Sequence, residues 1–238
     1  PVRFFTKEID EEPDDLEFDP ELLETMRFAR TAFIDLLQNR EYSLHDRLVN
    51  VLSATAEIQY ALDEEDTEEI KAIAHELSRH EIIAERAESL KKALPEKPLE
   101  NAENMLLYLE RLDFIGDTLP QQIKDASRFV KKLSAPIKAQ ESGEYEKRAV
   151  YFTYRYFLKA VRDFDLISKI KAMIVFVFAA EVINLSREQN AHARFETVKE
   201  LCKEIEYSGD NMDRIYDDSY LSDIFSDTSM LALLEWTL

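Results

Sequence analysis

The residues best suited to chemistry lie in a predicted helix over residues 144–162. Arg148, Arg155, Lys159 and Arg162 follow one another at spacings of seven, four and three positions. On an α-helix, these spacings place the four side chains within about 60° of one another around the axis. Such a stripe would suit an anion or a carboxylate-bearing ligand. Internal pairing is the preferred interpretation, because buried charges are normally paired. The acids considered as partners are Asp163, Asp165, Glu181, Glu204 and Glu206.

The same predicted helix is rich in aromatic residues, with five in the seven positions from 151 to 157. At 100° per residue these side chains point in several directions, so we expect protein to surround the helix. The preferred interpretation is a packing helix whose tyrosine hydroxyls bond neighbouring helices. The alternative is a pocket lined by Tyr151, Tyr154 and Tyr156.

The sequence gives little support for metal binding, phosphate binding or thiol chemistry. The four histidines are His45, His75, His80 and His192. None follows an acid by three positions, as the ligands of di-metal bundles do. His80 begins like a zinc protease motif, but Ala84 stands where the second histidine must be. Three glycines are too few for a phosphate-binding loop, and Cys202 lies on an apolar stripe that predicts a buried, inert thiol. We therefore predict no metal, no cofactor and no catalytic residue in this chain.

The composition is strongly acidic. Thirty Lys and Arg residues stand against 49 Asp and Glu residues, which gives a net charge of −19. This charge disfavours binding to nucleic acids and anionic lipids and would attract lysine-rich partners. The preferred interpretation is that the charge simply serves solubility. The longest apolar run, residues 172–180, is far shorter than the ~20 residues of a membrane span. With a single cysteine, the chain has no internal disulfide, and we expect a cytoplasmic protein.

Only three glycines among 238 residues predict an all-α fold, because sheets need many tight turns. We expect a bundle of about eight to ten helices that form one domain overall. An acidic lead-in over 1–18 would precede an N-terminal helical subdomain over 19–133. A loop over 134–143 would separate it from a C-terminal subdomain over 144–238, which holds a central pair of apolar helices. The expected helices span about 20–39, 44–62, 70–94, 101–112, 118–133, 144–162, 165–186, 191–207, 210–216 and 228–236.

Several segments resemble a known family. The stretch YFTYRYFLKAVRDFD at residues 151–165, the apolar helix after it and KEIEYS at 203–208 resemble the C-terminal region of the flagellin lysine-N-methylases. Residues 1–9 look like the segment that follows the cysteine-rich part of these enzymes, and residues 36–40 and 44–48 are similar as well. The likeness extends along most of the chain, and the aromatic and basic helix is its most specific part.

This resemblance implies methyl transfer from S-adenosylmethionine to lysine side chains of flagellin or another lysine-rich protein. It also implies an iron–sulfur or metal-binding cysteine cluster, from which this chain departs, because Cys202 is its single cysteine. We therefore expect the helical, non-catalytic region of such an enzyme, inactive alone, which supports the substrate or the cysteine-rich region. The start at Pro1 without a methionine fits a piece of a longer protein. The alternative is an acidic helical adaptor that binds a basic protein.

Overall fold

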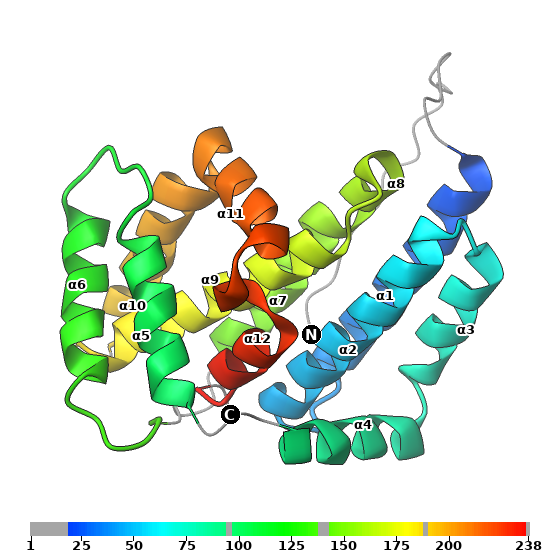
Figure 1. Ribbon diagram of the computed structural model, residues 1–238, viewed down its shortest axis with the longest axis horizontal. Coiled ribbons are helices and arrows are strands. Elements are labelled where there is room, and N and C mark those ends of the chain that lie inside the picture. The colour runs from blue at the N-terminus through cyan, green and yellow to red at the C-terminus, as the bar shows by residue number, and fades with distance from the viewer. Residues whose placement is uncertain (1–18, 94–96, 138–142, 188–189, 237–238) are drawn as a thin grey trace. The chain divides into compact units, whose positions relative to one another are not determined.

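The computed structural model describes residues 19–93, 97–137, 143–187 and 190–236 (Figure 1). Within these ranges every regular element is a helix: α1 to α12, two short 3₁₀-helices and one π-helix. The predicted all-α fold is confirmed, with slightly more helices than the eight to ten expected. The predicted lead-in over 1–18 lies outside the described residues. Among those described, no helix combines the length and apolar character that a membrane span requires.

The chain divides into two compact units, and each combines two stretches of sequence. The first unit runs to Ala87 and resumes at Glu146–Ile170, whereas the second comprises Glu88–Tyr145 and Lys171–Leu238. Both units therefore draw on residues from either side of the loop predicted at 134–143. The predicted subdomains, 19–133 and 144–238, are each one continuous stretch of sequence. Sequence order alone does not reveal which distant helices pack together.

Three helices form the larger part of the first unit. Helices α1 (Pro20–Gln38), α2 (Leu44–Asp63) and α3 (Thr67–Glu76) pack against one another (Figure 1). Helix α1 also contacts the 3₁₀-helix η1 (Phe157–Lys159) and α8 (Ala160–Asp163). The fully buried Phe33 of α1 meets Phe157 of η1 edge to face, with ring centroids 5.0 Å apart. This aromatic contact fixes the segment after α7 (Gly143–Tyr156) to the core of the unit.

The starts of α1 and α2 follow directly from local sequence. The Asp19 carboxylate accepts a hydrogen bond from the backbone N–H of Glu21 at 2.8 Å, and Pro20 is the first helical residue. The Ser43 hydroxyl accepts from the N–H of Asp46 at 3.1 Å. Each cap satisfies a backbone donor that the helix cannot pair itself, which stabilises the helix by about 1 kcal/mol. Both predicted starts are confirmed.

The prediction of a single helix over 70–94 is wrong, because two helices occupy this stretch. Helix α3 ends at Glu76, and α4 spans His80–Ala93. The turn between them is held by the Ser78 hydroxyl, which donates to the carbonyl of His75 at 2.8 Å, and by the buried Leu77. Helix α5 (Pro98–Leu109) begins at Pro98, where the fixed φ and missing N–H of proline are tolerated.

Two further predicted helices are not regular along their length. The helix expected over 144–162 consists of α7, η1 and α8, and the helix expected over 191–207 consists of α10 (Ala191–Leu201) and the π-helix η2 (Cys202–Glu206). The apolar helix expected over 165–186 is α9 (Ile167–Leu185). Its residues are buried without interruption from 168 to 184, as a helix that is apolar all round should be.

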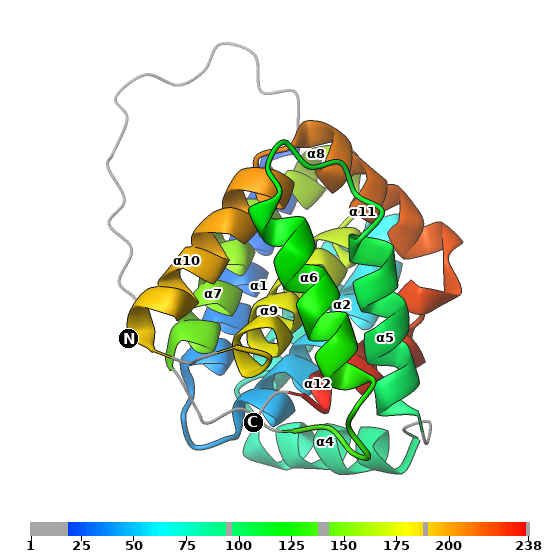
Figure 2. The same ribbon diagram turned by 90° about the vertical axis from the view of Figure 1, so that its left-hand side faces the viewer.

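In the second unit, α6 (Thr118–Val130) packs against both α5 and α10 (Figure 2). Helix α12 (Asp227–Leu234) packs against α5. Trp236 follows α12, is fully buried and donates its indole N–H to the carbonyl of Pro98 at 3.4 Å. Helix α11 (Gly209–Leu221) and the 3₁₀-helix η3 (Asp223–Phe225) complete this unit. The ring of Phe225 meets Tyr108 of α5 edge to face at 5.1 Å.

Candidate functional site

The predicted aromatic and basic residues come together in the first unit. We call Arg30, Tyr151, Tyr154, Arg155, Tyr156 and Lys159 the aromatic–basic cluster. The guanidinium of Arg155 and the ammonium of Lys159 both lie over the ring of Tyr156, at 5.4 and 4.9 Å from its centroid. Arg155 also lies 5.8 Å from the ring centroid of Tyr151 and donates to its hydroxyl at 2.9 Å. Two residues of the expected stripe therefore lie against two of the expected tyrosines.

Arg30 belongs to this cluster and was not predicted. Its guanidinium lies 4.7 Å from the ring centroid of Tyr154 and donates to the Tyr154 carbonyl at 3.4 Å. Burial lowers the pKa of Arg30; the nearby Tyr154 opposes this shift and Arg27 adds to it. The two partners are 124 positions apart in the sequence. No local spacing rule could have joined them.

The four residues of the predicted stripe do not share one environment. Arg148 is only 8 % exposed, whereas Arg155, Lys159 and Arg162 are exposed. Helix α7 is covered around Arg148, and it ends at Tyr156, before Lys159. The tighter turn of η1 then changes the angular relation that a continuous α-helix would impose. The surface available to a ligand is therefore the C-terminal part of the stripe.

Three of the acids considered as partners of the stripe bind other groups. The carboxylates of Asp163 and Asp165 bind the ammonium of Lys169 at 2.8 and 2.7 Å. Glu204 binds Lys203 at 2.7 Å. The contacts of Arg155 and Lys159 with tyrosine rings lie within one helical segment, so the packing interpretation, in which tyrosine hydroxyls bond neighbouring helices, stays a prediction. A ligand at the exposed basic residues stays a prediction.

A buried ionic group holds the start of this helical segment in place. The carboxylate of Glu146, on α7, accepts from Arg40 at two atoms, both at 3.0 Å, and from Arg47 at 2.9 Å. Its side chain is 5 % exposed, as is fitting for a charge with two cationic partners. Burial favours the neutral acid, but the hydrogen bonds and charges of Arg40 and Arg47 outweigh it and lower the pKa of Glu146. The group ties α7 to α2 through Arg47 and to the turn before α2 through Arg40.

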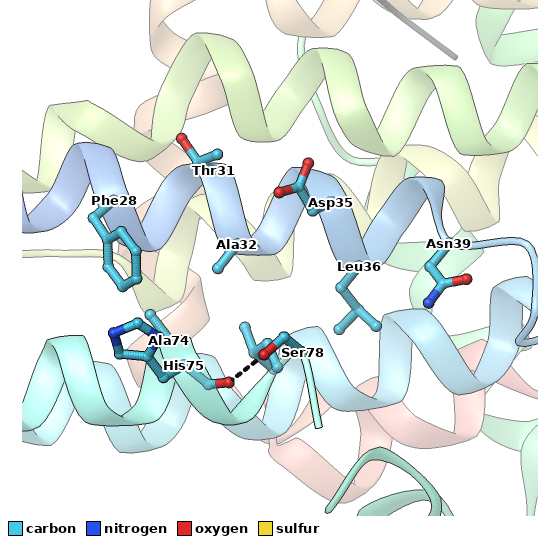
Figure 3. Close-up of a pocket in the computed structure, with 10 residues that line it drawn as sticks. Phe28, Thr31, Ala32, Asp35, Leu36, Asn39, Ala74, His75 and Ser78 are labelled. Carbon is cyan, nitrogen blue, oxygen red and sulfur yellow. Dashed lines mark hydrogen bonds between the residues drawn. The ribbon is translucent and has the colours of Figure 1, made fainter. Parts of the chain in front are cut away.

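A second candidate site is the groove between α1 and α3, which we call the α1–α3 groove. It contains a larger hollow of about 320 Å³ (Figure 3) and a smaller one of about 280 Å³. Phe28 and His75 line both hollows, and their ring centroids are 4.7 Å apart. The larger hollow is also lined by Thr31, Ala32, Asp35, Leu36, Asn39, Ala74, Leu77 and Ser78. The smaller one is also lined by Glu21, Glu24, Thr25 and Lys71.

The residues of this chain do not fit the cysteine cluster that the resemblance implies. In the part of the chain that the structure describes, no three His, Cys, Asp or Glu side chains are placed to hold a metal ion. Cys202 is half-buried at the start of η2, rather than fully buried as predicted. A single thiol cannot supply the several thiolates of an iron–sulfur cluster. No step of a methyl transfer is therefore derived from these residues.

The described residues thus form an all-helical protein with two candidate sites. A family model described as the FliB lysine N-methylase C-terminal domain matches residues 30–233. The chain therefore belongs to the FliB lysine N-methylase family, through its C-terminal domain, and the resemblance found in the sequence is confirmed. Comparison with curated proteins and with solved structures gave no match.

Proposed function

We propose that this chain is the helical, non-catalytic region of a flagellin lysine-N-methylase and supports the lysine-bearing substrate. The observation that carries the proposal is the family match over residues 30–233 in a chain with one cysteine. A thiolate cluster of the kind the family resemblance implies needs several cysteines. The cluster and S-adenosylmethionine would then be bound by a cysteine-rich region outside these 238 residues, which the helical region supports along with the substrate.

The charge of the chain supports a lysine-bearing partner. With 49 acids against 30 basic residues, its field attracts cationic segments and accelerates their association. Flagellin is the partner that the resemblance implies. Attraction of this kind weakens as salt rises, because exposed charges are screened over about 10 Å at 0.1 M salt.

Two measurements on the purified 238-residue chain test this proposal. In a methyl-transfer assay with S-adenosylmethionine and flagellin, we expect no methylation of flagellin lysines. In a binding assay at low salt, we expect the chain to retain flagellin. Methylation by the chain unaided, or stoichiometric iron in the purified protein, would contradict the non-catalytic role.

A second candidate function is an acidic adaptor with no link to methylation, favoured by the net charge of −19 alone. Polylysine and an unrelated basic protein serve as probes to separate the two functions. An adaptor of this kind binds all three at low salt and releases all three at high salt. A methylase region should retain flagellin at a salt concentration that releases the two other probes.

A further inference from the structure

The smaller hollow of the α1–α3 groove combines an aromatic ring with carboxylates. Phe28 is 39 % exposed, although it is a large apolar residue, and Glu21 and Glu24 lie beside it on α1. A lysine side chain has four methylene groups that suit an apolar surface and an ammonium that suits carboxylates and ring faces. The hollow therefore offers both kinds of contact that this side chain requires.

Thr25 provides an independent sign of a ligand in this hollow. Its side chain lines the hollow, yet the residue is only 1 % exposed. Among the residues that the structure describes, its hydroxyl has no hydrogen-bond partner. A buried hydroxyl without a partner destabilises a fold. The hydroxyl itself is not exposed, so a bound donor recovers the lost interaction only with a small shift of the side chains that cover it. A lysine ammonium carries three such donors.

The charged residues that line the hollow have one more carboxylate than they have cations, and Lys71 also acts electrostatically on Glu21. Lys71 is paired with Glu68 at 2.7 Å, and Glu24 with Arg27 at 2.5 Å. Glu21 accepts a hydrogen bond from the Thr67 hydroxyl at 3.2 Å, but it forms no ion pair within the described ranges. The surplus charge at the hollow is thus negative and is centred on Glu21.

The larger hollow continues the groove beyond the ring pair. Figure 3 shows Phe28 facing His75, with Leu36 and Ser78 further along between the two helices. Apolar side chains there can receive residues next to the lysine, and the hydroxyl and amide groups can bond their backbone. Asp35, on the same helix, is exposed and adds a second negative charge.

We propose that the α1–α3 groove holds a lysine-bearing segment of the substrate protein, an inference that rests on the proposed function. The lysine side chain occupies the smaller hollow, where its ammonium donates to the Glu21 carboxylate and, after a small local shift that exposes it, to the Thr25 hydroxyl. Its methylene groups lie against Phe28, and the flanking residues follow the larger hollow. The step is binding only, since no bond forms or breaks there.

Two other surfaces suit a lysine less well. The aromatic–basic cluster carries positive charge and repels a cation. A hollow of about 610 Å³ between α2 and α3 is acidic, but Glu57 is paired with Arg86 at 2.6 Å and Asp66 caps α3. Glu69 also lines that hollow and is exposed, so it offers a matched control for loss of one negative charge.

The test measures the dissociation constant of the 238-residue chain for purified flagellin at fixed low salt. Thr25→Val keeps the shape of the side chain and removes the hydroxyl, and we expect about tenfold weaker binding. Its unfolding midpoint should be unchanged or higher, because an unpaired hydroxyl is lost. Glu21→Gln should weaken binding by a similar factor, whereas Glu69→Gln should change it less than about twofold.

A position-specific readout complements the affinities. A carbodiimide joins a carboxylate to a neighbouring lysine with loss of water, so flagellin lysines should be cross-linked to Glu21. If flagellin binds but the Thr25 and Glu21 variants bind like the parent chain, the groove is not the site and the proposed function stands. Cross-links confined to Glu57 and Glu69 would also show that the groove is not the site. If the parent chain does not bind flagellin, both proposals are wrong.

Discussion

Gln59 holds the turn between α8 and α9 through four hydrogen bonds. Its side-chain oxygen accepts from the backbone N–H groups of Leu166 at 2.8 Å and Ile167 at 3.1 Å. Its side-chain nitrogen donates to the carbonyl of Phe164 and to the carboxylate of Asp63, both at 2.8 Å. Because Gln59 lies on α2 and is only 8 % exposed, it is the polar link between α2 and this turn. The turn directly follows the segment that carries the aromatic–basic cluster.

Replacement of Gln59 by leucine retains the volume of the side chain and removes all four bonds. The N–H of Leu166 is buried, and a buried donor without a partner costs about 1–3 kcal/mol. The N–H of Ile167 and the carbonyl of Phe164 are partly buried, so water replaces their lost partners incompletely. The bond to Asp63 adds little, because this carboxylate is exposed. We expect Gln59→Leu to lower the free energy of unfolding by about 3 kcal/mol.

Urea denaturation followed by circular dichroism at the helical band measures this change. Gln121→Leu is the matched control, because Gln121 is exposed on α6 and its amide donates to Asp125 at 3.1 Å. The control should stay within about 0.5 kcal/mol of the parent chain. A Gln59 variant as stable as the control would refute the reasoning, since it would show that these backbone groups need no protein partner.

Three other predictions concern the first unit. Glu65 lies just after the C-cap of α2 with φ at 56°, a left-handed conformation that favours glycine, so Glu65→Gly should raise the free energy of unfolding by about 1 kcal/mol in urea; a decrease would contradict this. The lowered pKa of Glu146 means that its stabilising contribution is present above the ordinary carboxyl pKa and is lost as pH falls through the lowered value. The stability difference between the parent chain and Glu146→Gln should therefore shrink on acidification, and a gap independent of pH would refute this role. Reversal of both charges at Arg155 and Lys159 should lower the free energy of unfolding by about 1–2 kcal/mol, because both cations lie over one tyrosine ring. An unchanged unfolding midpoint would instead favour a ligand-binding role for these two residues.

The sequence predicted those features of the fold that neighbouring residues determine. The caps at Asp19 and Ser43 act on N–H groups two and three positions away, so a local pattern is sufficient to find them. The break between α3 and α4 has no proline or glycine to mark it, and the buried Leu77 is as typical of a helix interior as of a turn. Tertiary packing decides between these two outcomes, which is why a single long helix was predicted there.

The candidate sites likewise divide into features that neighbouring residues determine and features that tertiary packing determines. Residues 151–159 drew attention because aromatic and basic residues are close together in the sequence. Arg30 and the α1–α3 groove escaped prediction, because each depends on side chains from separate helices. Phe28 and His75 meet only after α1 and α3 have packed, and neither has a spacing that indicates a shared site. Surfaces that two helices share are determined by packing, which hydrophobic periodicity does not specify.

The segment KEIEYS at 203–208 explains why a family-like motif need not mark chemistry. Glu204 is 2 % exposed, and its carboxylate accepts from the backbone N–H groups of Ile115 at 2.7 Å and Gly116 at 3.3 Å. A Cβ atom at Gly116 would lie 3.1 Å from the same carboxylate, so the small residue permits this close approach. The hydrogen bond from Lys203 is the largest cause that lowers the pKa of Glu204. The backbone N–H donors and the charge of Lys203 lower it further. The motif thus encodes a buried contact that closes the loop before α6. In this segment, the family-like sequence therefore marks how the helices are held together.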